Sequence, residues 1–133
     1  MKRYIFFILL FFGGCSPPGL LLTNSGKPEV TIPRRTVQEV SNALADWSLS
    51  HGFNIIHTTF FSLEGERIAD SSSALHNINI GSHERVFFNY AETPSGVHII
   101  GDFLSRTEEL GDIVERRWLQ NELSTISQKL SAH

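Results

Sequence analysis

The side chains that could carry chemistry in this chain are its histidines, its hydroxyl groups and one cysteine. The histidines are dispersed, and no two have the spacing of metal ligands on one helix or strand. Ordinary polar positions account for this pattern. The alternatives are a pH sensor or a metal site, whose ligands would come from His57, His76 or His98.

Catalytic motifs are missing from the sequence. It contains no C-x-x-C, H-E-x-x-H, G-x-S-x-G or P-loop pattern. A serine triad is recognised by its geometry, and no serine here stands in an elbow motif. We therefore predict a protein that is not an enzyme and that needs no cofactor and no metal.

The cysteine, Cys15, stands at the end of a segment with the features of a secretory signal. Lys2 and Arg3 precede an apolar run over 4–12, and two glycines then lead into Cys15. A cationic start, a short apolar stretch and a small-residue cleavage site are typical of a signal peptide. The apolar run is much shorter than the ~20 residues that cross a bilayer as a helix.

The four residues Phe12-Gly13-Gly14-Cys15 resemble the lipobox of bacterial lipoproteins, which has Leu where this chain has Phe12. This resemblance covers residues 1–15 only. It implies that residues 1–14 are removed and that Cys15 is acylated on its sulfur and on its new amine. Several acyl chains, at ~0.8 kcal/mol per buried CH₂, would form a firm anchor. The alternative is a plain signal peptide with an incidental cysteine.

The same resemblance suggests where the protein resides. The residue after the cysteine is Ser16, as in lipoproteins of the outer membrane, so we expect a lipid-anchored protein there with its domain in the periplasm. The formal net charge of −3 becomes more negative when Lys2 and Arg3 are removed. This acidic balance argues against nucleic acid as a partner. We expect contact with the membrane through the lipid anchor alone.

Breaker residues and hydrophobic periodicity divide the remaining chain. Residues 15–35, rich in Pro and Gly, are predicted to form a lipidated tether. A single domain is expected over 36–133. Its first helix, predicted over 36–51, opens with a capping box at Thr36 and Glu39 and carries one apolar stripe.

Several strands and a second helix are predicted after this helix, in a sheet of three to five strands. A strand over 53–61 is followed by a turn at Glu64-Gly65-Glu66 and a return strand over 67–70, and alternation predicts a further strand over 75–80. Residues 84–106 have the pattern of a hairpin with its turn at 93–96. Gly101 would mark a bulge or a close packing point.

A last helix is predicted over about 109–131. The expected fold class is therefore α+β, in the order α-β-β-β-β-α. An antiparallel sheet would carry both helices on one face, packed through Trp47 and Trp118.

The sequence is compatible with two functions from different classes. The first is a non-catalytic accessory module that binds another envelope protein, and a purely structural envelope role is a variant of it. The second is a carrier or sensor of a lipid or small apolar ligand, held in a cavity between sheet and helices. Such a cavity would be lined by seven aromatic residues: Phe53, Phe60, Phe61, Phe87, Phe88, Tyr90 and Phe103.

Overall fold

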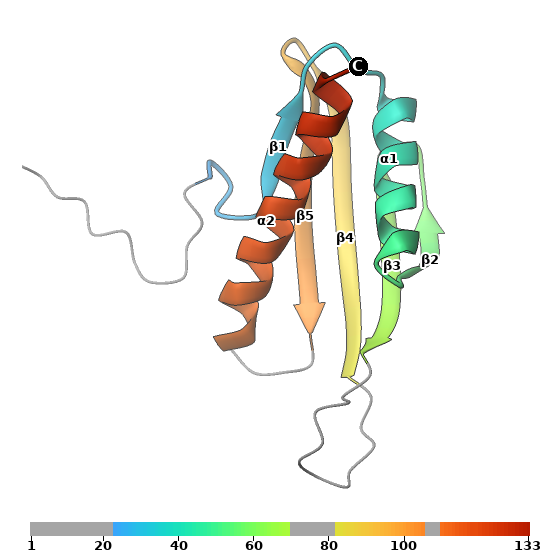
Figure 1. Ribbon diagram of the computed structural model, residues 1–133, viewed down its shortest axis with the longest axis vertical. Helices are drawn as coiled ribbons and strands as arrows, with labels where there is room; N and C mark the ends of the chain where they lie inside the picture. The colour runs from blue at the N-terminus through green and yellow to red at the C-terminus, as the bar shows by residue number, and fades with distance from the viewer. Residues whose placement is uncertain (1–22, 70–81, 106–109) are drawn as a thin grey trace, which may run out of the picture.

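The computed structural model describes residues 23–69, 82–105 and 110–133 (Figure 1). Five strands form one antiparallel sheet in the order β1-β5-β4-β3-β2, and two helices lie on one of its faces. The α+β prediction is confirmed, with one strand added before the first helix. The elements are β1 (Glu29–Ile32), α1 (Val37–Ser50), β2 (Asn54–Thr58), β3 (Ser62–Ala69), β4 (Ser82–Thr93), β5 (Gly96–Ser105) and α2 (Leu110–Ser131).

Helix α1 begins as the sequence predicts. The Thr36 hydroxyl accepts a hydrogen bond from the Glu39 backbone N–H at 3.2 Å, and the Glu39 carboxylate accepts one from the Thr36 N–H at 2.8 Å. This capping box satisfies two backbone donors that the first turn leaves free. The helix buries one apolar stripe against the sheet, formed by Val37, Val40, Leu44 and Trp47.

The β4–β5 hairpin is also confirmed. Its register runs without interruption from the pair Glu84–Ser105 to the pair Thr93–Gly96. Gly101 is therefore a close packing point and not a bulge in this pairing. A Cβ atom at Gly101 would lie 3.0 Å from a methyl group of Leu119, so a larger residue there would require the Leu119 side chain to shift.

The predicted turn at 64–66 is wrong, and the strand predicted over 53–61 ends earlier, at Thr58. Residues 64–66 do not form a turn, because they lie inside β3 and pair with β4. Gly65 is needed there for space, since a Cβ atom would lie 3.0 Å from Cβ of Phe53. The chain turns earlier, at Phe60 and Phe61, and neither is one of the residue types that usually interrupt a strand.

The predicted tether also ends too late. Residues 29–32 form β1, which pairs with β5, and Ile32 is fully buried. Ahead of β1, Pro28 is buried and its carbonyl accepts a hydrogen bond from the Gly101 N–H at 2.7 Å. The folded domain therefore includes residues that precede 36. Cys15 and the strand predicted over 75–80 lie outside the described residues.

The core fills the space between the sheet and the two helices. Helix α1 packs on β2, β3 and β4, whereas α2 packs on β1 and β5. The rings of Trp47 and Trp118 meet between the two halves, with their centroids 5.6 Å apart, which confirms the predicted contact. Phe53, Phe88 and Phe103 are buried beneath them.

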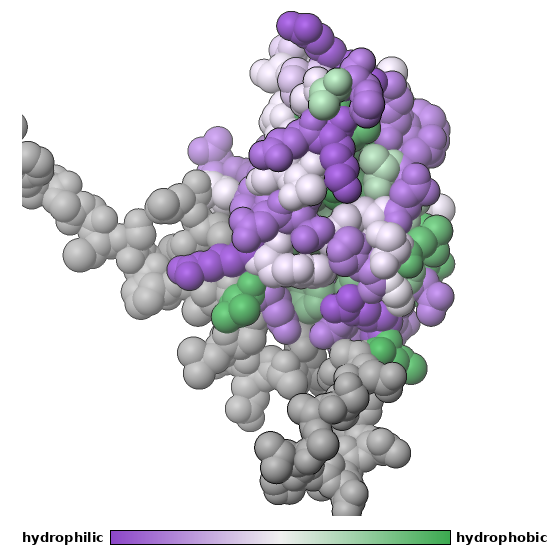
Figure 2. Space-filling view, viewed as in Figure 1, coloured by the Kyte–Doolittle hydropathy of each residue, from purple (hydrophilic) through white to green (hydrophobic). Residues whose placement is uncertain are grey.

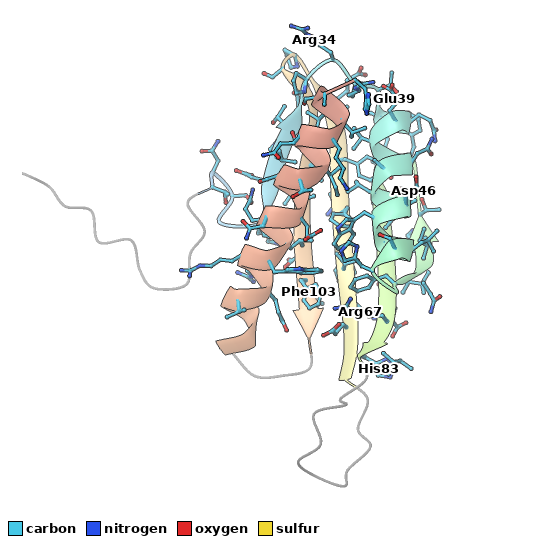
Figure 3. All side chains as sticks on the ribbon, viewed as in Figure 1. Arg34, Glu39, Asp46, Arg67, His83 and Phe103 are labelled. Atoms are coloured by element: carbon cyan, nitrogen blue, oxygen red, sulfur yellow. The ribbon has the colours of Figure 1, made fainter. Side chains whose placement is uncertain are left out.

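The turn between β1 and α1 contains a strained residue. Arg34, which follows Pro33, has a φ of +58° although it is not glycine. A left-handed backbone costs a residue with a side chain about 1–2 kcal/mol. The Arg34 side chain is exposed and lies at one end of the molecule (Figure 3).

We expect Arg34→Gly to raise the free energy of unfolding by roughly 0.5–1 kcal/mol, because the relief of strain exceeds the added flexibility of the unfolded chain. Arg34→Ala is the matched control, since it removes the guanidinium and keeps the strain. Chemical denaturation of the domain measures both. Equal gains in the two variants would show that the charge, and not the backbone, is the cause.

Candidate functional site

The turn between β2 and β3 carries two exposed phenylalanines on a fixed backbone. The Thr59 N–H donates to the Ser62 carbonyl at 2.8 Å, and the hydroxyls of the same two residues are 2.7 Å apart. The Phe61 carbonyl accepts from the Tyr90 N–H at 2.9 Å. These hydrogen bonds attach the turn to β4 as well as to its own two strands. We call Phe60 and Phe61 the Phe60–Phe61 tip.

The aromatic rings of this tip point to solvent. Phe60 is 62% exposed and Phe61 is 58% exposed, and the two rings meet edge to face at 4.9 Å. Beside Phe60 lies an open recess of about 390 Å³ next to the start of α1, lined by Val37, Gln38, Ser41, Thr58, Thr59 and Phe60. Exposed aromatic pairs beside a recess are typical of surfaces that bind other molecules.

The same hairpin forms an edge of the sheet. Strand β2 pairs with β3 only, and the order of strands places it at the end of the sheet. Four of its five residues are exposed: Asn54, Ile56, His57 and Thr58. A bulge between Ile55 and His57 interrupts its pairing. We call this strand the β2 edge; it offers backbone groups to which an extended segment could add.

The opposite edge of the sheet is covered by a side chain at its first residue, Glu29. The Glu29 N–H donates to the amide oxygen of Gln120 at 2.8 Å, and the Gln120 amide nitrogen donates to the Glu29 carbonyl at 2.9 Å. The amide of Gln120 thus occupies the position of a neighbouring strand beside β1. The sequence pattern places Gln120 outside the apolar face of α2 and gives no sign of this role, which depends on a contact between distant residues.

A narrow groove separates the two helices. Its volume is about 270 Å³, and Trp47, His51 and Glu122 lie among its lining residues. The Glu122 carboxylate accepts from the Trp47 indole N–H at 2.8 Å and lies 3.4 Å from His51 Nε2. These polar groups therefore hold α1 to α2. Figure 2 shows the helix-covered face as mostly polar, with only small separate apolar areas.

Arg67 and Glu84 form an ion pair at one end of the core. Arg67 donates to the Glu84 carboxylate and, at 2.8 Å, to the carbonyl of His51. Its guanidinium lies 4.3 Å from the centre of the Phe53 ring. Each of these contacts joins parts of the domain to one another, so Arg67 (Figure 3) is a structural residue.

The described histidines do not cluster into one site. His57 is on β2 and His98 on β5, three strand spacings or roughly 14 Å apart, which is too far for one metal ion. His76 lies outside the described residues. Within the described ranges, no group of three metal-binding side chains is found. His51, His83 and His98 each lie within 3.6 Å of a glutamate on a neighbouring element.

The seven aromatic residues of the carrier hypothesis do not line one cavity. Phe53, Phe88, Tyr90 and Phe103 are buried in the core, and the Phe60–Phe61 tip is exposed. Phe87 pairs with Asp102 on the sheet face that carries no helix. A larger hollow of about 630 Å³ lies at the end of α2 and contains none of them; it is lined by Pro33, Arg34, Arg35 and residues 130–133.

Comparison with known proteins assigns the chain to no family. No protein-family model matches the sequence, and no curated protein matches it. Among the described helices, none is both long enough and apolar enough to span a bilayer.

The first residue of β1 has a perturbed acidity. Burial raises the pKa of Glu29, but hydrogen bonds from Ser25 and from the Asn24 N–H, at 2.6 Å, lower it, and the charge of His98 adds to this. The sum of these effects places the pKa of Glu29 below its ordinary value of 4.5. The ionised carboxylate therefore fastens the segment before β1 to the sheet.

A lowered pKa makes this contact depend on pH. Glu29 contributes stability above pH 4.5, and this contribution is lost as the pH falls through the lower pKa of the folded state. We expect Glu29→Gln, which cannot ionise, to lose less stability than the wild type over that acidic range. Urea denaturation at a series of pH values measures this difference. Parallel pH profiles for the two proteins would contradict it.

Proposed function

We propose that this protein is a lipid-anchored protein of the bacterial outer membrane whose domain, in the periplasm, binds another envelope protein. Contact occurs through the Phe60–Phe61 tip and the β2 edge. The anchor rests on the resemblance of Phe12-Gly13-Gly14-Cys15 to a lipobox. The binding role rests on the structure of the hairpin.

The observation that carries the binding role is that two phenylalanines are exposed on a turn that hydrogen bonds hold in place. Burying a phenylalanine side chain is worth about 1.5–3 kcal/mol. Because the turn is already ordered, a partner that covers it gains this energy with little loss of conformational entropy. The open strand beside the tip supplies backbone groups that could direct the partner's orientation.

The carrier function lacks comparable support. It needs an apolar cavity between sheet and helices, but the aromatic residues nominated for its walls fill the core, form the tip or, in the case of Phe87, lie on the sheet face that carries no helix. The groove between the helices, at about 270 Å³, is smaller than the roughly 300–1,000 Å³ of typical ligand sites. The exposed tip favours a protein partner.

The anchor is tested with Cys15→Ala. In a Gram-negative host, we expect the wild type to gain the mass of a diacylglyceryl group and an acyl chain and to sediment with outer membranes. The variant should keep residues 1–14, because its cleavage depends on the modified thiol. Intact mass and membrane fractionation measure both. A wild type that is cleaved, unlipidated and soluble in the periplasm would refute the anchor.

The binding surface is tested with Phe60→Ser and Phe61→Ser. A photo-crosslinking residue at Thr58 should give a discrete product in the cells that make the protein. We expect each substitution to weaken binding at least about tenfold, since each removes about 1.5 kcal/mol or more of burial. The free energy of unfolding should change by less than about 0.5 kcal/mol, because both side chains are exposed.

Val114→Ser is the matched control for this experiment. Val114 is 69% exposed on α2, so its substitution removes a similar apolar side chain from a different surface. The crosslinked product should persist in this variant. If the product also persists when both phenylalanines are replaced, the tip is not the binding surface.

A further inference from the structure

We infer that the domain stands on the lipid surface in one orientation, with β1 and α2 toward the bilayer and the β2 edge away from it. This inference rests on the proposed lipid anchor at Cys15. It adds the direction in which the binding surface points. Three features support it: the place where the folded domain begins, the length of chain before it, and the width of the sheet.

The chain enters the domain beside β1. In the described part of the segment before β1, the Thr23 hydroxyl donates to the Lys27 carbonyl at 2.7 Å. The Asn24 N–H donates to the carboxylate of Glu29, and Lys27 forms an ion pair with Asp102 on β5 at 2.7 Å. These contacts attach residues 23–29 to the sheet, so the anchor pulls on the domain at this flank.

Little chain separates this flank from the anchor. Seven residues, 16–22, lie between Cys15 and Thr23. Whatever their conformation, the eight steps from Cα to Cα span at most about 28 Å. A flexible chain of this length has a mean span of about 16 Å. A tether over the whole of 15–35 would allow a much greater distance.

The sheet is wider than this mean span. Strands β1 and β2 are its two edges, separated by four spacings or roughly 19 Å (Figure 1). To turn the β2 edge toward the lipid, the chain from Cys15 would have to run back along the full width of the domain. That requires a span of at least about 19 Å, which exceeds the mean of about 16 Å, so fewer conformations of the chain provide it.

The direction of the β2 edge limits the partner. The Phe60–Phe61 tip lies at the end of β2, on the edge of the sheet farthest from β1. A partner segment that pairs there must approach from the aqueous layer, within about 50 Å of the lipid surface. The partner is therefore a periplasmic domain or segment and not one embedded in the same leaflet.

Energy transfer to labelled lipids tests this orientation. Cys15 is the sole cysteine of the sequence and its sulfur would be acylated, so an introduced cysteine is the single site for a donor dye. Asn24→Cys places it beside β1 and His57→Cys on β2; both side chains are exposed. The lipidated proteins are placed in phosphatidylethanolamine and phosphatidylglycerol vesicles containing a headgroup acceptor. We expect greater transfer from residue 24, corresponding to roughly 20 Å less separation.

A longer tether is the matched control. Twenty Gly and Ser residues inserted between Leu22 and Thr23 increase the mean span to about 29 Å, so the difference between the two donors should shrink. Equal transfer in the original proteins, or an unchanged difference after the insertion, would overturn the orientation. A protein that is not lipidated would fail to bind the vesicles at all, and this separate result would refute the anchor itself.

Discussion

The contact between Trp47 and Trp118 is the interaction on which the domain depends. Each helix covers a different part of the sheet, α1 over β2 to β4 and α2 over β1 and β5. Trp47 also meets Phe53 and Phe88, and Trp118 meets Phe103, at centroid distances between 5.5 and 5.9 Å. This aromatic cluster makes one core out of two halves. The indole N–H of Trp47 is satisfied by Glu122, so the cluster can be buried without an unpaired donor.

The core explains why the proposed binding surface is at the periphery. The cluster and the aliphatic residues around it fill the space between the helices and the sheet, and Glu122 in the groove contacts Trp47 and His51. Charged side chains within the domain, such as Arg67 and Glu84, connect its secondary-structure elements. The exposed aromatic groups lie on the turn between β2 and β3, where Tyr90 fixes the backbone without covering the rings.

Much of this fold is predictable from local pattern, and the errors have physical reasons. Thr36 and Glu39 fix the start of α1, and alternation in the β4–β5 hairpin identifies its buried face. Glycine commonly marks turns, whereas Gly65 makes room for Phe53 inside a strand. Strand β1 falls within the predicted tether because it pairs with β5, which is about seventy residues away in the sequence. Such pairing leaves no local sequence signal. The exposure of the tip is equally hidden, since a sequence does not distinguish a core phenylalanine from a surface one.

The two edges of the sheet have different consequences for association. A sheet with two open edges, held at a membrane surface, could add copies of itself edge to edge in a continuing array. Here Gln120 occupies the backbone groups of Glu29, so the first residue of β1 cannot pair with a neighbouring strand unless Gln120 moves. The β2 edge has no such side-chain contact among the described residues, and its bulge between Ile55 and His57 restricts what can pair with it. The two edges are therefore unequal, and this difference disfavours a continuing chain of copies.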